Sequence, residues 1–316
     1  GRFYRAYGTF EQPNPFGGFM NLIAFPAIGL VMGLGVAWVE RQRGRISATY
    51  LTPIPLWAGL GVVTAVAGTM GVILSWSRGA WLGFLAGAFV LALFSSRRLI
   101  IGIASMGFAL VVLGSGMLLG VSENFGPALA VADRLGGFRE EFTLGDVRGV
   151  DINDTNYSVL ERLAHWQAAV DMARDDLWTG VGCGNYPAAY HEYALINFID
   201  ALGHAHNYYL NLLAEVGLPG LLAYGLFWIV IIAQTISLSS RVAWPERGVV
   251  VGLLAAWTAL SVHHLVDKLY VNNIYVHLGA MIGLLQLYAW PGFGVGREGD
   301  LAAGPGNHIS DKECPG

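Results

Sequence analysis

Seven stretches of about 20 mostly apolar residues constrain this chain more than any other feature of its sequence. A helix of that length crosses the hydrocarbon core of a bilayer, and helices of soluble proteins are rarely so long and so poor in charge. Charged residues make up 13% of the chain, against about 25% in a soluble domain. The sequence therefore predicts an all-α, polytopic transmembrane helix bundle, with spans at residues 17–39, 56–75, 80–96, 99–121, 217–238, 247–266 and 272–290.

Basic residues in the short loops predict how the bundle is oriented. Arginines gather in the loops after the first, third and fifth spans, which lie on one side by parity, and cytoplasmic loops carry such an excess. They are Arg41, Arg43, Arg45, Arg97, Arg98, Arg241 and Arg247. We therefore expect a multi-pass protein of the cytoplasmic (inner) membrane, with residues 1–16, 75–79, 122–205 and 264–273 on its outer face.

This topology divides the chain into four regions. Residues 1–121 hold an outer N-terminal segment and four spans, and residues 122–205 form one large extracytoplasmic loop. Residues 206–290 hold a half-buried helix and three further spans. Residues 291–316 are rich in Gly, Pro and charge, so we expect a disordered cytoplasmic tail. Because the chain begins at Gly1 without Met or a secretory leader, we expect a fragment that lacks N-terminal helices.

The large loop contains one segment with helical periodicity. Apolar residues recur at helical spacing between Ser158 and Leu177, and Ser158 with Glu161 fits a capping box. We expect an amphipathic helix that lies on the membrane or caps the bundle, either as a plain lid or with a chemical role. Asp151 and Asp154 precede it and could hold Mg²⁺ near a pyrophosphate, although turn and capping roles are more frequent for such residues.

His206 stands at the start of a short helix on the outer side. The run from Tyr208 to Val216 makes about two and a half turns, and Gly217-Leu218-Pro219-Gly220 breaks it before the next span. The positive end of the helix dipole keeps a histidine neutral and able to accept a proton, which suits a general base. A plain interfacial histidine is the competing interpretation, although Glu215 in the same apolar stretch is unusual.

Three arginines lie at the outer boundary, and one of them, Arg78, is a candidate for binding phosphate. Arg78 lies between two spans, where a charge is costly, and its guanidinium can hold two phosphate oxygens at once. Arg2 and Arg5 lie in the aromatic segment before the first span, which also contains Asn14. Anchoring at the interface is the alternative for Arg78, because tryptophans flank it and Trp favours that layer.

The remaining polar motifs predict neither a metal site nor a disulfide. His263 and His264 precede Asp267 in a His-His-x-x-Asp pattern, but adjacent residues of a helix point apart and do not converge on a metal. We expect Asp267 to contact Lys268 or an arginine, or His264 one turn away. Cys183 and Cys314 fall on opposite sides of the predicted topology and cannot pair. A net charge of −4 gives no sign of nucleic-acid binding.

Two motifs give the chain a resemblance to the O-antigen ligase and O-antigen polymerase superfamily, which shares its core domain with bacterial O-oligosaccharyltransferases. One is Arg-x-x-x-Leu in an outer loop, present as Arg78-Gly79-Ala80-Trp81-Leu82. The other is His-Asn, nine residues and Gly-x-x-Gly, present from His206-Asn207 to Gly217-Leu218-Pro219-Gly220. Residues 5–15 and 180–186 are also similar to the family, so the resemblance covers most of residues 1–290.

The resemblance implies a metal-independent, inverting glycosyltransferase with a GT-C-like helix bundle and no cofactor. Its donor would be a glycan on undecaprenyl pyrophosphate. Its acceptor would be a hydroxyl of lipid A-core, of another lipid-linked glycan or of a protein. By motif, Arg78 stabilises the pyrophosphate leaving group and His206 deprotonates the acceptor hydroxyl. The candidates for binding substrate are Arg5, Arg2, Asn207 and Asn14.

Two functions of other classes compete with this interpretation. A transporter of a small anion such as bicarbonate should show broken helices and ionisable residues near the bilayer midplane. The predicted spans are nearly free of charge, and the ionisable residues gather at the outer edge. A flippase or a non-catalytic subunit for envelope-polysaccharide assembly is the other alternative, and it would work without His206.

Overall fold

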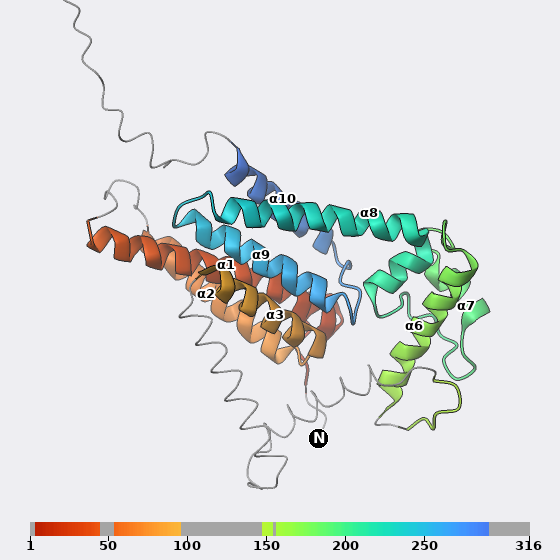
Figure 1. Ribbon diagram of the computed structural model, residues 1–316. Coiled ribbons are helices and arrows are strands. Elements are labelled where there is room, and N and C mark those ends of the chain that lie inside the picture. The colour runs from red at the N-terminus through yellow and green to blue at the C-terminus, as the bar shows by residue number, and fades with distance from the viewer. Residues whose placement is uncertain (1–3, 45–53, 96–146, 154–155, 291–316) are drawn as a thin grey trace, which may run out of the picture.

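The computed structural model describes residues 4–44, 54–95, 147–153 and 156–290, and this part of the chain is almost entirely helical. One isolated bridge joins Leu195 and Phe198. Figure 1 shows a bundle of long helices with α6 and the short α7 at one end. The elements are η1 (Gly8–Phe10), α1 (Pro13–Gln42), α2 (Ile54–Leu74), α3 (Arg78–Ser95), α6 (Tyr157–Asp175), α7 (Tyr186–Tyr193), α8 (Tyr208–Ser239), α9 (Glu246–His263) and α10 (Ile274–Ala289).

The helices confirm the predicted polytopic membrane fold. Four of them are long and apolar enough to cross a bilayer, namely α1, α2, α3 and α8. The shorter α10 and the central α9 coincide with the last two predicted spans. The predicted span 99–121 and the tail 291–316 lie outside the described residues.

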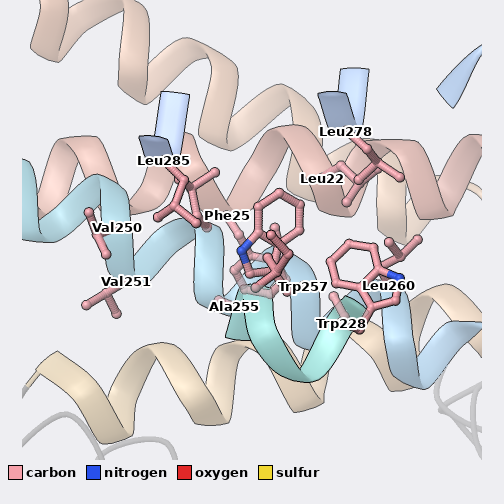
Figure 2. Packing of buried hydrophobic residues seen from close by; sticks show 14 of the residues in the cluster. Leu22, Phe25, Trp228, Val250, Val251, Ala255, Trp257, Leu260, Leu278 and Leu285 are labelled. Atoms are coloured by element: carbon pink, nitrogen blue, oxygen red, sulfur yellow. The ribbon is translucent and has the colours of Figure 1, made fainter. Parts of the chain in front are cut away.

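Helix α9 forms the centre of the bundle. It is buried over most of its length, and α1, α3 and α8 pack against it. Figure 2 shows Phe25 of α1, Trp228 of α8 and Trp257 of α9 in the resulting core. The outer helices expose their apolar side chains instead, which is the arrangement expected where lipid surrounds the protein.

Glycines let α1 and α9 approach each other at backbone distance. A Cβ at Gly29 would overlap the carbonyl oxygen of Gly248, and one at Gly33 would overlap that of Pro245. In lipid the hydrophobic effect does little to drive helices together, so close van der Waals packing of small residues is a main source of association. These glycines therefore set the distance between the two helices that carry most of the core.

The segment between the long spans folds back over one end of the bundle. Helix α6 packs against α8 and α7, and it buries the apolar face that its periodicity predicts, including Leu160, Leu163 and Ala164. The predicted capping box is wrong, because the helix already begins at Tyr157 with Asn156 at its N-cap. The side chain of Asn156 instead accepts a hydrogen bond from the Asn153 backbone.

Helix α8 is kinked at Gly217, where the sequence predicts a break. This residue has φ 66° and ψ −173°, outside the helical region and in the positive-φ range that glycine tolerates best. The kink frees the carbonyls of Ala214 and Glu215, and these accept hydrogen bonds of 2.9 Å from backbone N–H groups of the segment 177–182. That segment therefore fixes the angle between the two halves of α8.

We predict that Gly29→Ala destabilises the protein by about 1–3 kcal/mol, because the new methyl group meets backbone that cannot move aside. The loss should appear as a lower unfolding temperature of the purified protein in detergent. The matched control is Gly279→Ala in α10, where a Cβ meets nothing within 4 Å. Alanine favours a helix by about 1 kcal/mol over glycine, so the control should be neutral or slightly stabilising. Equal unfolding temperatures for the two variants would contradict the packing argument.

Candidate active site

The outer residues that the topology prediction groups together do meet at one end of the bundle. Arg5 precedes α1, Arg78 opens α3 and His206 precedes α8, and these helix starts lie at the end covered by α6 (Figure 1). Arg41 in the last turn of α1 and Arg247 in the first turn of α9 lie at the opposite end. The site residues and these basic loop residues are therefore separated by the length of the bundle.

A cavity of about 280 Å³ opens at the covered end. Its volume is near the lower limit for small-molecule sites. Arg5, Arg78 and Arg162 line it from three separate segments, and all the permanently charged lining side chains that the structure describes are arginines. Guanidinium groups match the geometry of phosphate oxygens, so the cavity suits a phosphorylated ligand. The lining residues are Arg5, Asn14, Trp76, Arg78, Gly79, Ser158, Arg162, His263 and Val266.

The first turn of α3 adds backbone polarity to this cavity. Ser77 precedes the helix, and its hydroxyl accepts a hydrogen bond of 3.3 Å from the N–H of Ala80. The first N–H groups of a helix have no intrahelical partner, and the helix dipole is positive at that end. Because Arg78 and Gly79 form the first turn and line the cavity, a phosphate there would meet both a guanidinium group and a helix N-terminus.

A short hydrogen-bond chain leads from this cavity to a buried carboxylate. Arg5 Nη2 donates to Asn14 Oδ1 over 2.9 Å, and Asn14 Nδ2 donates to Asp267 Oδ2 over 2.6 Å. Arg5 Nε also donates to the backbone carbonyl of Ser75 over 3.0 Å. The amide of Asn14, predicted only as a substrate contact, therefore links α1 to the end of α9.

Asp267 has one partner that the sequence suggests, Lys268, and others that it does not. Besides Asn14, it accepts the backbone N–H of Lys268 over 2.8 Å, and His264 lies instead 3.3 Å from the hydroxyl of Tyr224. Burial opposes ionisation of Asp267, but its histidine neighbours and Arg162 outweigh burial and lower its pKa. The carboxylate is therefore an anion at neutral pH.

The backbone of His206 is held in an uncommon conformation. Its φ of 51° lies in the left-handed region, which non-glycine residues adopt infrequently and which tends to mark functional sites. Its N–H donates to His204 Nδ1 over 3.1 Å, and its carbonyl accepts from Trp166 Nε1 over 3.3 Å. Asn207 then caps α8, and its Oδ1 accepts the N–H groups of Tyr209 and Leu210 in the first turn. These contacts fix the direction in which the imidazole points.

The imidazole of His206 is partly buried and neutral. Its side chain is 19% exposed, and burial, with a smaller contribution from His204, lowers its pKa to about 3 against the opposing effect of Asp267. The sequence argument gave the same direction from the helix dipole, whereas the main cause is burial. Among the described residues neither ring nitrogen has a hydrogen-bond partner. His206 Nδ1 lies 4.0 Å from Asp267 Oδ1, a distance that can shorten when substrate binds.

One group of side chains has the spacing of a metal site. His204, His206 and Asp267 each offer one ligand atom, and these three atoms lie within 4.8 Å of one another. However, His204 Nδ1 already accepts a backbone N–H, so in the neutral tautomer its Nε2 carries the proton. A metal would have to displace that hydrogen bond or remove that proton. The geometry therefore fits proton transfer better than metal binding.

The other predicted site residues have mixed outcomes. Asn207 uses its amide oxygen to cap α8, and its Nδ2 donates to the carbonyl of Leu265 over 2.9 Å. Its substrate contact stays a prediction. Arg2 and Asp154 lie outside the described residues. Asp151 is exposed.

Arg162 is the site residue that the sequence argument missed. It lies on α6 one turn after Ser158, and both side chains line the cavity. On an amphipathic helix a lone arginine usually belongs to the solvated face. The available signal was the helical spacing of Ser158 and Arg162, which puts them on one face, but only the fold shows what that face meets.

Comparison with known proteins identifies the family of the chain. The family model described as O-antigen ligase matches residues 63–225, just over half of the chain. The matched range includes Arg78, Arg162 and His206. A search of curated proteins gave no match. The chain therefore belongs to the O-antigen ligase family and is a multi-pass membrane protein with the glycosyltransferase-type activity of that family.

Proposed function

We propose that this protein transfers a glycan from undecaprenyl pyrophosphate to an acceptor hydroxyl, with inversion at the sugar and without a metal ion. One observation carries the proposal. A cavity lined by three arginines is connected through Asn14 and Asp267 to a partly buried, neutral histidine. The cavity offers positive charge for a leaving pyrophosphate, and His206 offers a proton acceptor for the incoming hydroxyl.

In the proposed reaction His206 takes the proton of the acceptor hydroxyl. The oxygen then forms a bond to the anomeric carbon as the bond from that carbon to the pyrophosphate oxygen breaks. Attack from the face opposite the leaving group inverts the configuration. The imidazolium that forms is stabilised by Asp267, whose carboxylate lies 4.0 Å from it before substrate binds. Asp267 and Asn14 are positioning residues in this scheme.

The arginines take the part that a metal ion has in other glycosyltransferases. Negative charge develops on the pyrophosphate as the bond breaks, and fixed positive groups stabilise it without reorganising. Arg78 and Arg5 come from the membrane bundle, whereas Arg162 comes from the segment that covers it. The permanent charge of arginine makes it suitable for this role in a partly buried cavity.

We place the reaction at the outer face of the cytoplasmic membrane. The excess of arginine at the opposite end of the bundle supports this orientation. A lipid-linked donor would remain in the bilayer and bring its pyrophosphate to the level of the helix ends. The acceptor is a hydroxyl of lipid A-core, of another lipid-linked glycan or of a protein.

A transporter is the less well supported alternative. Transporters bind their substrates near the bilayer midplane. Here the cavity lies at the end of the bundle, and its charged side chains come from helix ends and from α6.

We predict that glycan transfer depends on the cavity arginines and on His206, but not on metal. The assay contains a purified polyprenyl-pyrophosphate glycan donor and EDTA. Arg78→Ala and Arg162→Ala should each lower kcat about 10²–10³-fold, because each removes a guanidinium group that stabilises the negative charge on the leaving pyrophosphate. His206→Ala should lower kcat about 10²–10⁴-fold, because the general base is lost. The assay uses the full-length protein in liposomes.

The matched control for Arg162→Ala is Arg174→Ala. Arg174 lies on the same helix, is largely exposed and pairs with Asp171 over 2.8 Å, away from the cavity. It should transfer glycan like the wild type. Equal transfer by all variants would refute the assignment of the site, and transfer that stops in EDTA would refute a metal-free reaction.

We predict that transfer stays active at mildly acidic pH. The lowered pKa of His206 keeps the imidazole neutral down to pH values near 4. Of an ordinary histidine with pKa 6.5, only about one molecule in 30 would be neutral at pH 5. Between pH 7 and pH 5, kcat/KM should change less than about threefold, provided that the folded fraction is checked at each pH. The prediction would be contradicted if kcat/KM of the wild type fell on acidification with a midpoint near pH 6.5. That fall would also have to be absent in His206→Gln.

A further inference from the structure

His263 is a buried polar side chain for which the proposed mechanism has no use. It ends α9 and is 1% exposed. Neither of its ring nitrogens has a hydrogen-bond partner among the described residues. An unpaired buried polar group destabilises the folded protein, so its presence calls for a partner that binds there.

Two glycines form a slot that holds this imidazole. A Cβ at Gly18 of α1 would lie 3.2 Å from His263 Nδ1, and one at Gly79 of α3 would lie 2.6 Å from Nε2. The ring is therefore held edgewise between the two helices and cannot turn freely. Gly79 also lines the arginine cavity, so the Nε2 edge of His263 faces the part of the cavity wall that Gly79 forms.

The cavity places His263 among phosphate-binding groups. His263 lines it together with Arg5, Arg78 and Arg162. The first turn of α3, which presents its N-terminal end to the cavity, is in contact with the ring through Gly79. The guanidinium groups and the helix N-terminus around this cavity favour an anion, whereas the nearby Asp267 carboxylate opposes one.

We propose that His263 is a substrate-binding residue, whose Nε2–H donates a hydrogen bond to a phosphoryl oxygen of the pyrophosphate. This rests on the proposed function, since it assigns a fourth side chain to the same pyrophosphate cavity. The ligand supplies the partner that the imidazole lacks in the empty protein. The unpaired nitrogen is then a stability cost that the free protein bears and that binding removes.

The test compares two replacements of similar size in the purified full chain in detergent. His263→Gln keeps an N–H donor, and His263→Leu removes it. The probe is inorganic pyrophosphate at constant ionic strength, and the measurement is the ligand-induced rise in unfolding temperature, from which an affinity follows. The same measurement is made on the wild type and on Arg78→Ala.

We expect His263→Leu to bind pyrophosphate about 10- to 100-fold more weakly than wild type, and His263→Gln to stay within about fivefold. Without pyrophosphate, His263→Leu should unfold at the same or a higher temperature, because an apolar side chain replaces an unpaired polar one. Weaker binding together with greater stability is not what a packing role would give.

The failures of the two proposals can be told apart. Should wild type bind pyrophosphate and Arg78→Ala lose it, while His263→Leu binds like wild type, only the role of His263 is overturned. Equal losses of affinity and stability in the Gln and Leu variants would assign His263 to packing and also overturn it. Absence of any pyrophosphate effect on wild type would overturn the pyrophosphate cavity itself, and with it both proposals.

Discussion

The site depends on how closely α1 and α9 approach each other. Where Gly29 meets Gly248 the two backbones are in contact, and a single methyl group would separate them. Asn14 lies in the first turn of α1, and Asp267 follows the end of α9. The hydrogen bond of 2.6 Å between these two side chains forms only at that helix separation. Packing deep in the bundle thus sets the distance between the arginine cavity and the histidine at its end.

The two halves of the proposed site use burial in opposite ways. Arginine keeps its charge in almost any environment, so enclosing the cavity strengthens its attraction for phosphate. Histidine loses its charge when buried, and this is the form that can accept a proton. Asp267 stands between them, bound to Asn14 on one side and near His206 on the other. One partly buried region can therefore hold permanent cations and a neutral base within a few side chains of each other.

The sequence predicted the spans, the grouping of outer segments and the break at Gly217 because each depends on local composition or on a single residue type. It did not predict the bond between Asn14 and Asp267, which lie 253 positions apart, because no periodicity relates them. Arg162 was missed because an arginine on an amphipathic helix looks solvated until the neighbouring helices are placed. The capping box failed because Asn156 starts the helix earlier, and Ser158 then lies inside the first turn.

The central helix has a consequence for how the protein is made. Helix α9 is not among the four helices apolar enough to cross a bilayer alone, since it begins with Glu246 and Arg247 and ends with His263. Its surroundings in the finished protein are α1, α3 and α8 rather than lipid. During synthesis it leaves the ribosome after those three helices, which are already available to receive it. We therefore expect earlier parts of the same chain to guide the membrane insertion of α9, so that the proposed active end of the bundle is completed only at that late step.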